Sequence, residues 1–129
     1  ISIHDWIEGG HGIEENIQIA KWLKEVGVDM IDCSGGGATP QARASIGERT
    51  TDQVGLAGEL RAATGLATMA VGYITEAKQA NKLIEDGTCD ITLLGRQLLR
   101  DPYWPTHAAQ ILGDDPKPHM PLQYHVVAG

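Results

Sequence analysis

The chain has 129 residues, which suits one domain, and its 42% of hydrophobic residues can supply a core. Its formal charge of −7 argues against nucleic acid or an anionic membrane as a partner, because both are bound by basic surfaces. The sequence contains no run of about 18 apolar residues, so we expect no membrane span.

The N-terminus and the cysteines bear on the cell compartment. The opening ISIHDWIEGG lacks the basic and long apolar parts of a signal peptide. Cys33 and Cys89 lie far apart and form no CxxC pattern. We therefore expect a reduced, cytoplasmic protein without a disulfide. Because the first residue is Ile1 and lies in a predicted strand, we also expect the chain to be a cleaved or partial product.

Short apolar runs predict four strands. The first begins at Ile1, and each of the others follows a helical segment and one glycine, at position 27, 65 or 87. Glycine suits the left-handed position that ends a helix. Short continuous runs are typical of strands buried on both faces of a parallel sheet. The three later strands are predicted at residues 28–33, 67–71 and 90–94.

Apolar residues at three- and four-residue spacing predict amphipathic helices between these strands. The three apolar faces consist of Ile13, Ile17, Ala20 and Leu23; of Leu56, Leu60 and Ala63; and of Ala77, Ala80, Leu83 and Ile84. Thr51 and Thr75 are predicted N-caps. Asp101 before Pro102 predicts the start of a last helix that runs to Leu112.

Strands that alternate with helices predict an α/β fold with a parallel sheet. A closed (β/α)8 TIM barrel takes about 250 residues, so about four βα units are half of one. We predict that residues 1–112 form these units and that residues 113–129 form an irregular C-terminal tail. Because a half barrel exposes strand edges and an inner face, we expect the missing part of the barrel to be a partner.

The loops after the first two strands are polar. His4, Asp5 and His11 could suggest a metal site, but their spacing fits no standard zinc pattern, so we predict no metal and a polar rim loop. Cys33 has no identifiable base nearby. We therefore interpret it as a buried structural thiol rather than a nucleophile.

Three strand ends carry features of a phosphate site. Glycines follow Ser34, and the turns Gly72-Tyr73 and Gly95-Arg96 follow the last two strands. In TIM barrels the loops after the seventh and eighth strands often bind phosphate through backbone N–H groups. Arginine adds a charged fork that suits phosphate. The alternative is that both glycines only form tight turns and that Arg96 pairs with a surface carboxylate.

The whole pattern resembles the Old Yellow Enzyme family along nearly all of the chain. The segments ISIHDWIEGG, AKWLKEVGVDMIDCSGG, TMAVGYIT and DITLLGRQLLRDPYWP carry the resemblance. Its most specific motifs are Ala70-Val71-Gly72 and Gly95-Arg96, followed by Leu99-Arg100-Asp101-Pro102.

The resemblance implies the C-terminal half of an FMN-binding barrel. Such an enzyme takes hydride from NAD(P)H and passes it to an activated alkene such as an enone. By resemblance, the backbones of Gly72, Tyr73, Gly95 and Arg96 hold the FMN phosphate, with the Arg96 side chain added. Ser34 and Gly36 lie on the phosphate and ribityl side of the same pocket.

Much of the family's machinery would lie upstream of Ile1, including the substrate-binding pair and the proton-donating tyrosine, so catalytic residues are left unassigned. In related bacterial enzymes an arginine near the C-terminus reaches the active site of a neighbouring subunit, which implies a homo-oligomer. Here the tail reads Gln123-Tyr124-His125, and His125 is the nearest candidate for that role.

Three alternatives remain open at this stage. A family relative that acts on amines or xenobiotics, with another small-molecule substrate, would share the same FMN half. The chain could be a non-catalytic fragment or half barrel. It could also belong to a phosphate-sugar barrel without flavin, although the run from Gly95-Arg96 to Asp101-Pro102 argues against that because it carries the family resemblance.

Overall fold

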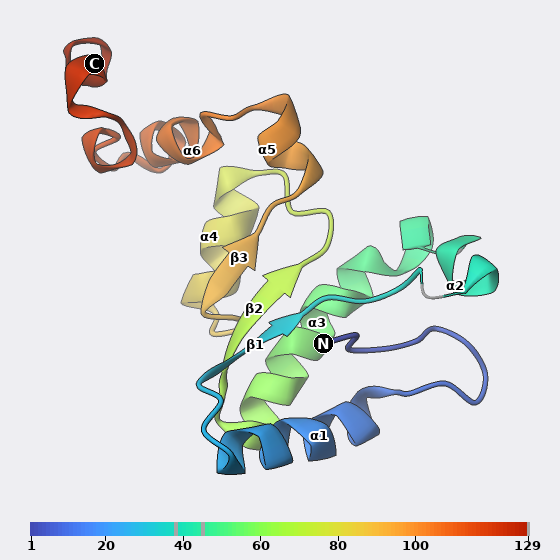
Figure 1. Cartoon of the computed structure of the whole chain (residues 1–129). Helices are drawn as coiled ribbons and strands as arrows, with labels where there is room; N and C mark the ends of the chain where they lie inside the picture. Colours follow the sequence, from blue (N-terminus) through green and yellow to red (C-terminus); the bar gives the residue numbers. More distant parts are fainter. Residues whose placement is uncertain (38, 45, 129) are drawn as a thin grey trace.

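Three parallel strands form the centre of the molecule (Figure 1). The computed structural model describes residues 1–37, 39–44 and 46–128, with the backbone but not the side chains of residues 43, 44 and 46–52. The strands are β1 (Met30–Cys33), β2 (Ala67–Val71) and β3 (Ile91–Leu93), in the order β1-β2-β3. All pairs are parallel, as the alternating sequence predicts.

The first predicted strand is reduced to a single bridge. Ser2 pairs in parallel with Ser34, where Ile3 N donates to Ser34 O at 2.7 Å and Ser34 N donates to Ile1 O at 3.2 Å. The segment therefore lies beside β1, as expected, but the prediction of a fourth full strand is wrong. The chain turns away directly afterwards, because Trp6 N donates to His4 Nδ1 at 2.8 Å and Trp6 has a φ of 60°.

Helices separate the strands as predicted. The long ones are α1 (Ile13–Glu25), α3 (Ile46–Thr64), α4 (Ala77–Glu85) and α6 (Trp104–Leu112). Short elements complete the chain: α2 (Pro40–Ala44), α5 (Arg96–Arg100) and the 3-10 helices η1 (Lys117–His119) and η2 (Leu122–Val127). The glycines at 27, 65 and 87 all have positive φ, which confirms their helix-ending role.

The predicted helix starts differ from the observed ones, most of all at α3. Thr51 lies inside α3 (Ile46–Thr64), and the N-cap position of α4 is occupied by Glu76 rather than by its neighbour Thr75. Asp101 does accept a hydrogen bond from Tyr103 N at 3.1 Å, but α6 begins only at Trp104. The predicted end of this helix at Leu112 is confirmed.

The two faces of the sheet differ in burial. Ile31, Cys33, Thr68 and Ala70 point to one face and are buried with Leu60 of α3 in the core. The residues between them point to the other face and are exposed or half-buried: Met30, Asp32, Ala67, Met69, Val71, Ile91 and Leu93. One face of the sheet is thus covered by helices and the other is uncovered.

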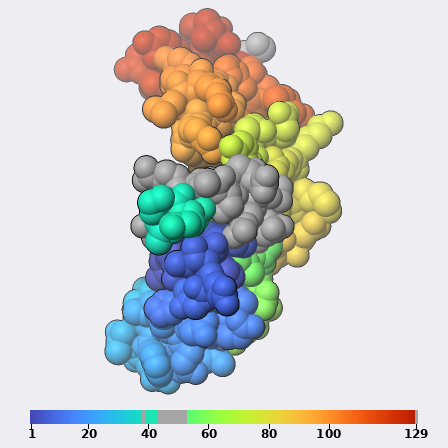
Figure 2. All heavy atoms as spheres, turned by 90° about the vertical axis from the view of Figure 1, so that its right-hand side faces the viewer, coloured from blue at the N-terminus to red at the C-terminus, as the bar shows by residue number. Residues whose placement is uncertain are grey.

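The molecule is elongated, with α1 at one end and the C-terminal elements at the other (Figures 1 and 2). The tail contains the two 3-10 turns and packs on α6, where Thr106 Oγ1 donates to His119 O at 3.4 Å. Within the described residues, the helices are too short or too polar to cross a membrane.

Candidate functional site

A hollow of about 310 Å³ lies at the carboxyl ends of β2 and β3. It is bordered by five of the six predicted site residues, namely Ser34, Gly72, Tyr73, Gly95 and Arg96. Gly36 does not border it, and its neighbour Gly35 does. The parallel register explains this convergence, because Val71 pairs with Leu93 and both strands end at the same edge.

The turn after β2 is built by backbone geometry and one side chain. Gly72 and Tyr73 have positive φ angles of 153° and 45°, so the chain bends sharply over the hollow. Gln53 of α3 donates from Nε2 to Val71 O at 2.8 Å. Because a trans peptide is planar, this bond directs the Gly72 N–H to the side opposite α3.

The turn after β3 leaves open space at a glycine. A Cβ built on Gly95 would meet no atom within 4 Å, and Gly95 borders the hollow. The Gly95 carbonyl accepts hydrogen bonds from Leu98 N at 3.1 Å and Leu99 N at 3.3 Å, which starts α5. The glycine therefore provides a cradle into which a ligand can approach the backbone.

The hollow is basic although the chain is acidic. Arg96 and Arg100 line it, and among its described lining residues there is no carboxylate. The Arg96 guanidinium lies over the Tyr73 ring, 4.5 Å from the centroid, and Arg96 Nη1 donates to Tyr73 Oη at 3.4 Å. Within the described part of the chain Arg96 forms no ion pair, contrary to the alternative of a surface carboxylate partner. These features fit an anion such as a phosphate monoester.

Gln53 and Arg100 border the hollow but were not predicted from the sequence. A signal for Gln53 exists, since it lies seven residues before Leu60 and so shares the apolar face of α3. A polar residue at such a position needs a buried partner. Arg100 follows Arg96 by four residues and therefore shares its face of α5.

The other predicted groups do not form a reactive centre. Burial raises the pKa of the Cys33 thiol to about 11, and both cysteines are free, so the interpretation of a structural thiol is confirmed. The His4 ring stacks on Trp6 with 4.3 Å between centroids. The described residues contain no group of three side chains suited to a metal ion.

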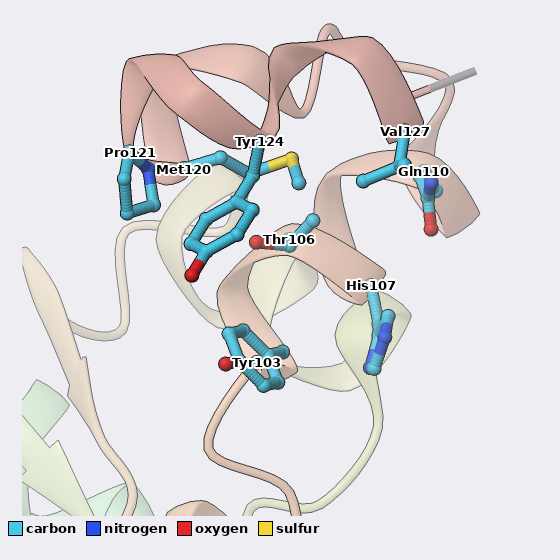
Figure 3. Close-up of a pocket in the computed structure, with 8 residues that line it drawn as sticks. All are labelled: Tyr103, Thr106, His107, Gln110, Met120, Pro121, Tyr124 and Val127. Carbon is cyan, nitrogen blue, oxygen red and sulfur yellow. The ribbon is translucent and has the colours of Figure 1, made fainter.

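A second hollow of about 390 Å³ lies between α6 and the tail (Figure 3). Tyr124 reaches from the tail toward α6, with Thr106 and Met120 beside it. His107 borders this hollow, and its Nδ1 lies within hydrogen-bond distance, 2.7 Å, of Asp101 Oδ2. His125 Nε2 lies 3.3 Å from Met120 O of its own tail. The phosphate-type features thus gather at the strand ends and not in this larger hollow.

The sequence of the chain matches a known protein family. The sequence profile of the NADH:flavin oxidoreductase / NADH oxidase family matches residues 1–115. The chain belongs to this flavin oxidoreductase family. The resemblance to Old Yellow Enzymes is confirmed, and with it FMN as the cofactor of the family.

Three NADPH dehydrogenases are similar to this chain in sequence. The one from Halalkalibacterium halodurans is 42% identical over 113 residues, which are 88% of this chain and 32% of the relative. Those from Bacillus licheniformis and Bacillus subtilis are 40% and 38% identical over 124 residues, covering 96% of this chain and 35% of each relative. The chain therefore spans about a third of the length of the curated relatives it matches.

Proposed function

We propose that the chain supplies the FMN phosphate site of an NADPH-dependent oxidoreductase that reduces activated alkenes such as enones. The observation that carries this proposal is the basic hollow at the ends of β2 and β3, in a chain of a flavin oxidoreductase family. The residues present fit the phosphate: a glycine cradle at Gly95, a bent turn at Gly72 and the two arginines.

Each residue then has a definite task. The backbones of Gly72, Tyr73, Gly95 and Arg96 donate hydrogen bonds to the phosphate, and the Arg96 and Arg100 side chains neutralise its charge. Ser34, at the edge of the hollow, would lie toward the ribityl chain, and Gly36 would lie beyond that edge on the same side. When bound, FMN supplies the transfer of hydride from NADPH to the β-carbon of the alkene.

The remaining part of the enzyme is proposed to lie in polypeptide outside this chain. The apolar side chains of Met69, Ile91 and Leu93 lie on the uncovered face of the sheet, which would be the inner face of a barrel. An N-terminal part of the barrel would cover it and would bring the substrate-binding and proton-donating residues. We also propose a cytoplasmic homo-oligomer in which His125 faces a neighbouring active site.

The alternative functions differ in whether they keep the FMN phosphate site. Membership of a flavin family excludes the phosphate-sugar barrel without flavin. An enzyme that acts on amines or xenobiotics would keep the same phosphate site. A non-catalytic fragment would keep the fold but bind FMN weakly or not at all.

The test is made on the protein purified from its native source. Denaturing mass analysis shows whether a longer or second polypeptide accompanies the chain, and a visible spectrum shows bound flavin. We expect flavin bands that NADPH bleaches without oxygen and that 2-cyclohexenone restores. A chain of 13.8 kDa alone that takes up no added FMN would contradict the proposal. Bleaching of the flavin bands by an amine without NADPH, and no restoration by the enone, would support the relative that oxidises amines.

A further inference from the structure

Tyr73 occupies a backbone conformation that its side chain disfavours. Its φ is 45°, in the left-handed region, where glycine or asparagine is accommodated much more easily than a bulky residue. Its side chain gains little from burial, because Tyr73 is 48% exposed. Strained residues that packing does not explain are concentrated at functional sites. The tyrosine ring therefore needs another reason to be at this turn.

The ring has one specific partner, Arg96. The guanidinium carbon lies 4.5 Å from the ring centroid, and Nη1 lies 3.4 Å from the tyrosine oxygen. A guanidinium that stacks through its flat face keeps most of its N–H groups in the plane of its edge. The ring therefore fixes the plane of the guanidinium and leaves donors for an anion in the hollow that both residues line.

We propose that Tyr73 is a positioning residue, whose ring holds the Arg96 fork in the orientation that receives a phosphate monoester. The inference rests on the proposed phosphate site and deepens it. Without the ring, Arg96 is an exposed side chain that must lose its rotamer freedom when the anion binds. With the ring, part of that entropy is already lost, and phosphate affinity rises.

The test is a titration of the full chain with inorganic phosphate, followed by NMR of the arginine Nε–H groups. The Arg96 resonance is assigned by its loss in Arg96→Lys. We expect the ring current of Tyr73 to displace this resonance in the wild-type chain and in Tyr73→Phe, and phosphate to shift it further. Tyr73→Leu should lose the displacement and bind phosphate about two- to fivefold more weakly, as for an exposed cation–π pair.

Two further variants make the result decisive. Tyr73→Asn removes the ring but suits the left-handed backbone, so it replaces Tyr73→Leu should that variant fail to fold. Tyr103→Leu removes an exposed tyrosine from the other hollow and should leave phosphate binding unchanged. If phosphate does not move the Arg96 resonance in the wild-type chain, the phosphate site and the proposed function are wrong. If it does, and the ring-free variants bind as tightly as wild type, only the role of Tyr73 is wrong.

Discussion

Asp90 joins helix α3 to strand β2 through one carboxylate. Its Oδ2 accepts hydrogen bonds from Arg61 Nε and from Thr68 N, both at 2.9 Å, and its Oδ1 accepts one from Arg61 Nη2 at 3.0 Å. The hydrogen bonds from Arg61 and from the Thr68 N–H hold the pKa of Asp90 below its ordinary value of 3.8. Because the folded pKa is the lower one, the ionised carboxylate stabilises the fold above about pH 3.8, and this stabilisation is lost as pH falls through the folded value.

We therefore predict that Asp90→Asn lowers the melting temperature at pH 7 and that the difference from wild type disappears below the folded pKa of Asp90. Thermal unfolding followed by circular dichroism at several pH values measures this. Asp86→Asn is the control, since among the described residues Asp86 forms its ion pair with exposed Lys82, one helical turn away, and should matter little. A difference between Asp90→Asn and wild type that persists undiminished in acid would refute the assignment.

A substitution at Gly95 tests whether the open space at this glycine lets a phosphate approach the backbone. Gly95→Ala adds a methyl group where no atom lies within 4 Å, so the fold should tolerate it, but the methyl group would keep a phosphate from the backbone. We predict about tenfold weaker FMN binding, roughly the loss of one charge-assisted hydrogen bond. Gly55 occupies an exposed position of α3 that also has space for a Cβ. Gly55→Ala should leave flavin binding unchanged while stabilising the helix by about 0.5–1 kcal/mol. Equal FMN affinity in Gly95→Ala and wild type would contradict the cradle.

Some residues of the hollow could be predicted from the sequence and others could not. Gly72, Tyr73, Gly95 and Arg96 were predictable because they lie in the turns after two strands whose ends are set by the parallel register. Gln53 was not, because its contact with Val71 depends on where α3 crosses the sheet, 18 residues from its partner in sequence. Gly36 was placed by resemblance alone, and in the structure its neighbour Gly35 borders the hollow.

At the scale of elements, α3 is the helix that organises the core. Leu60 is fully buried against the sheet, and Val54 and Ala57 share its face. The predicted face was right for Leu60 but wrong for Ala63, which is exposed, because the helix rotates to bury Ala57 instead. Amphipathic spacing therefore identified the helix but did not fix its rotation, which depends on tertiary packing.

This packing predicts the effect of a truncation in α3. Leu60→Ala should lower the free energy of unfolding by about 2–5 kcal/mol, because it removes buried carbon and leaves a cavity. Urea denaturation measures the change. Leu99→Ala, at a position that is 84% exposed on α5, should change it by less than about 0.5 kcal/mol. Similar effects of the two substitutions would show that α3 does not pack as described.

At the scale of the whole molecule, one face of the sheet is uncovered and exposes apolar side chains to solvent. Asp32, Met69 and Ile91 lie side by side across the three strands on that face, and Ile91 is 41% exposed. Sequence periodicity predicted strands buried on both faces, which holds only if another polypeptide covers the second face. What covers the second face of the sheet could not be predicted from this sequence, because the covering residues would belong to another polypeptide.

Co-expression tests the proposed covering part. The part of the Bacillus licheniformis NADPH dehydrogenase that lies outside the matched segment would be produced together with this chain. We predict that the two co-purify, and that Ile91→Lys abolishes the association by placing a charge in the barrel interior. Val26→Lys, at a 79% exposed position at the end of α1, should not affect it. Association that survives Ile91→Lys would show that this face is not the contact.

The most direct test of the central claim compares FMN with riboflavin, which differs only in lacking the phosphate. Fluorescence quenching gives the two dissociation constants for the wild-type chain and for Arg96→Ala. The account predicts that FMN binds at least about tenfold more tightly than riboflavin, as expected for charge-assisted phosphate contacts, and that Arg96→Ala narrows this ratio by weakening FMN alone. Equal affinities for the two flavins, or a ratio that Arg96→Ala leaves unchanged, would contradict a phosphate site at the ends of β2 and β3.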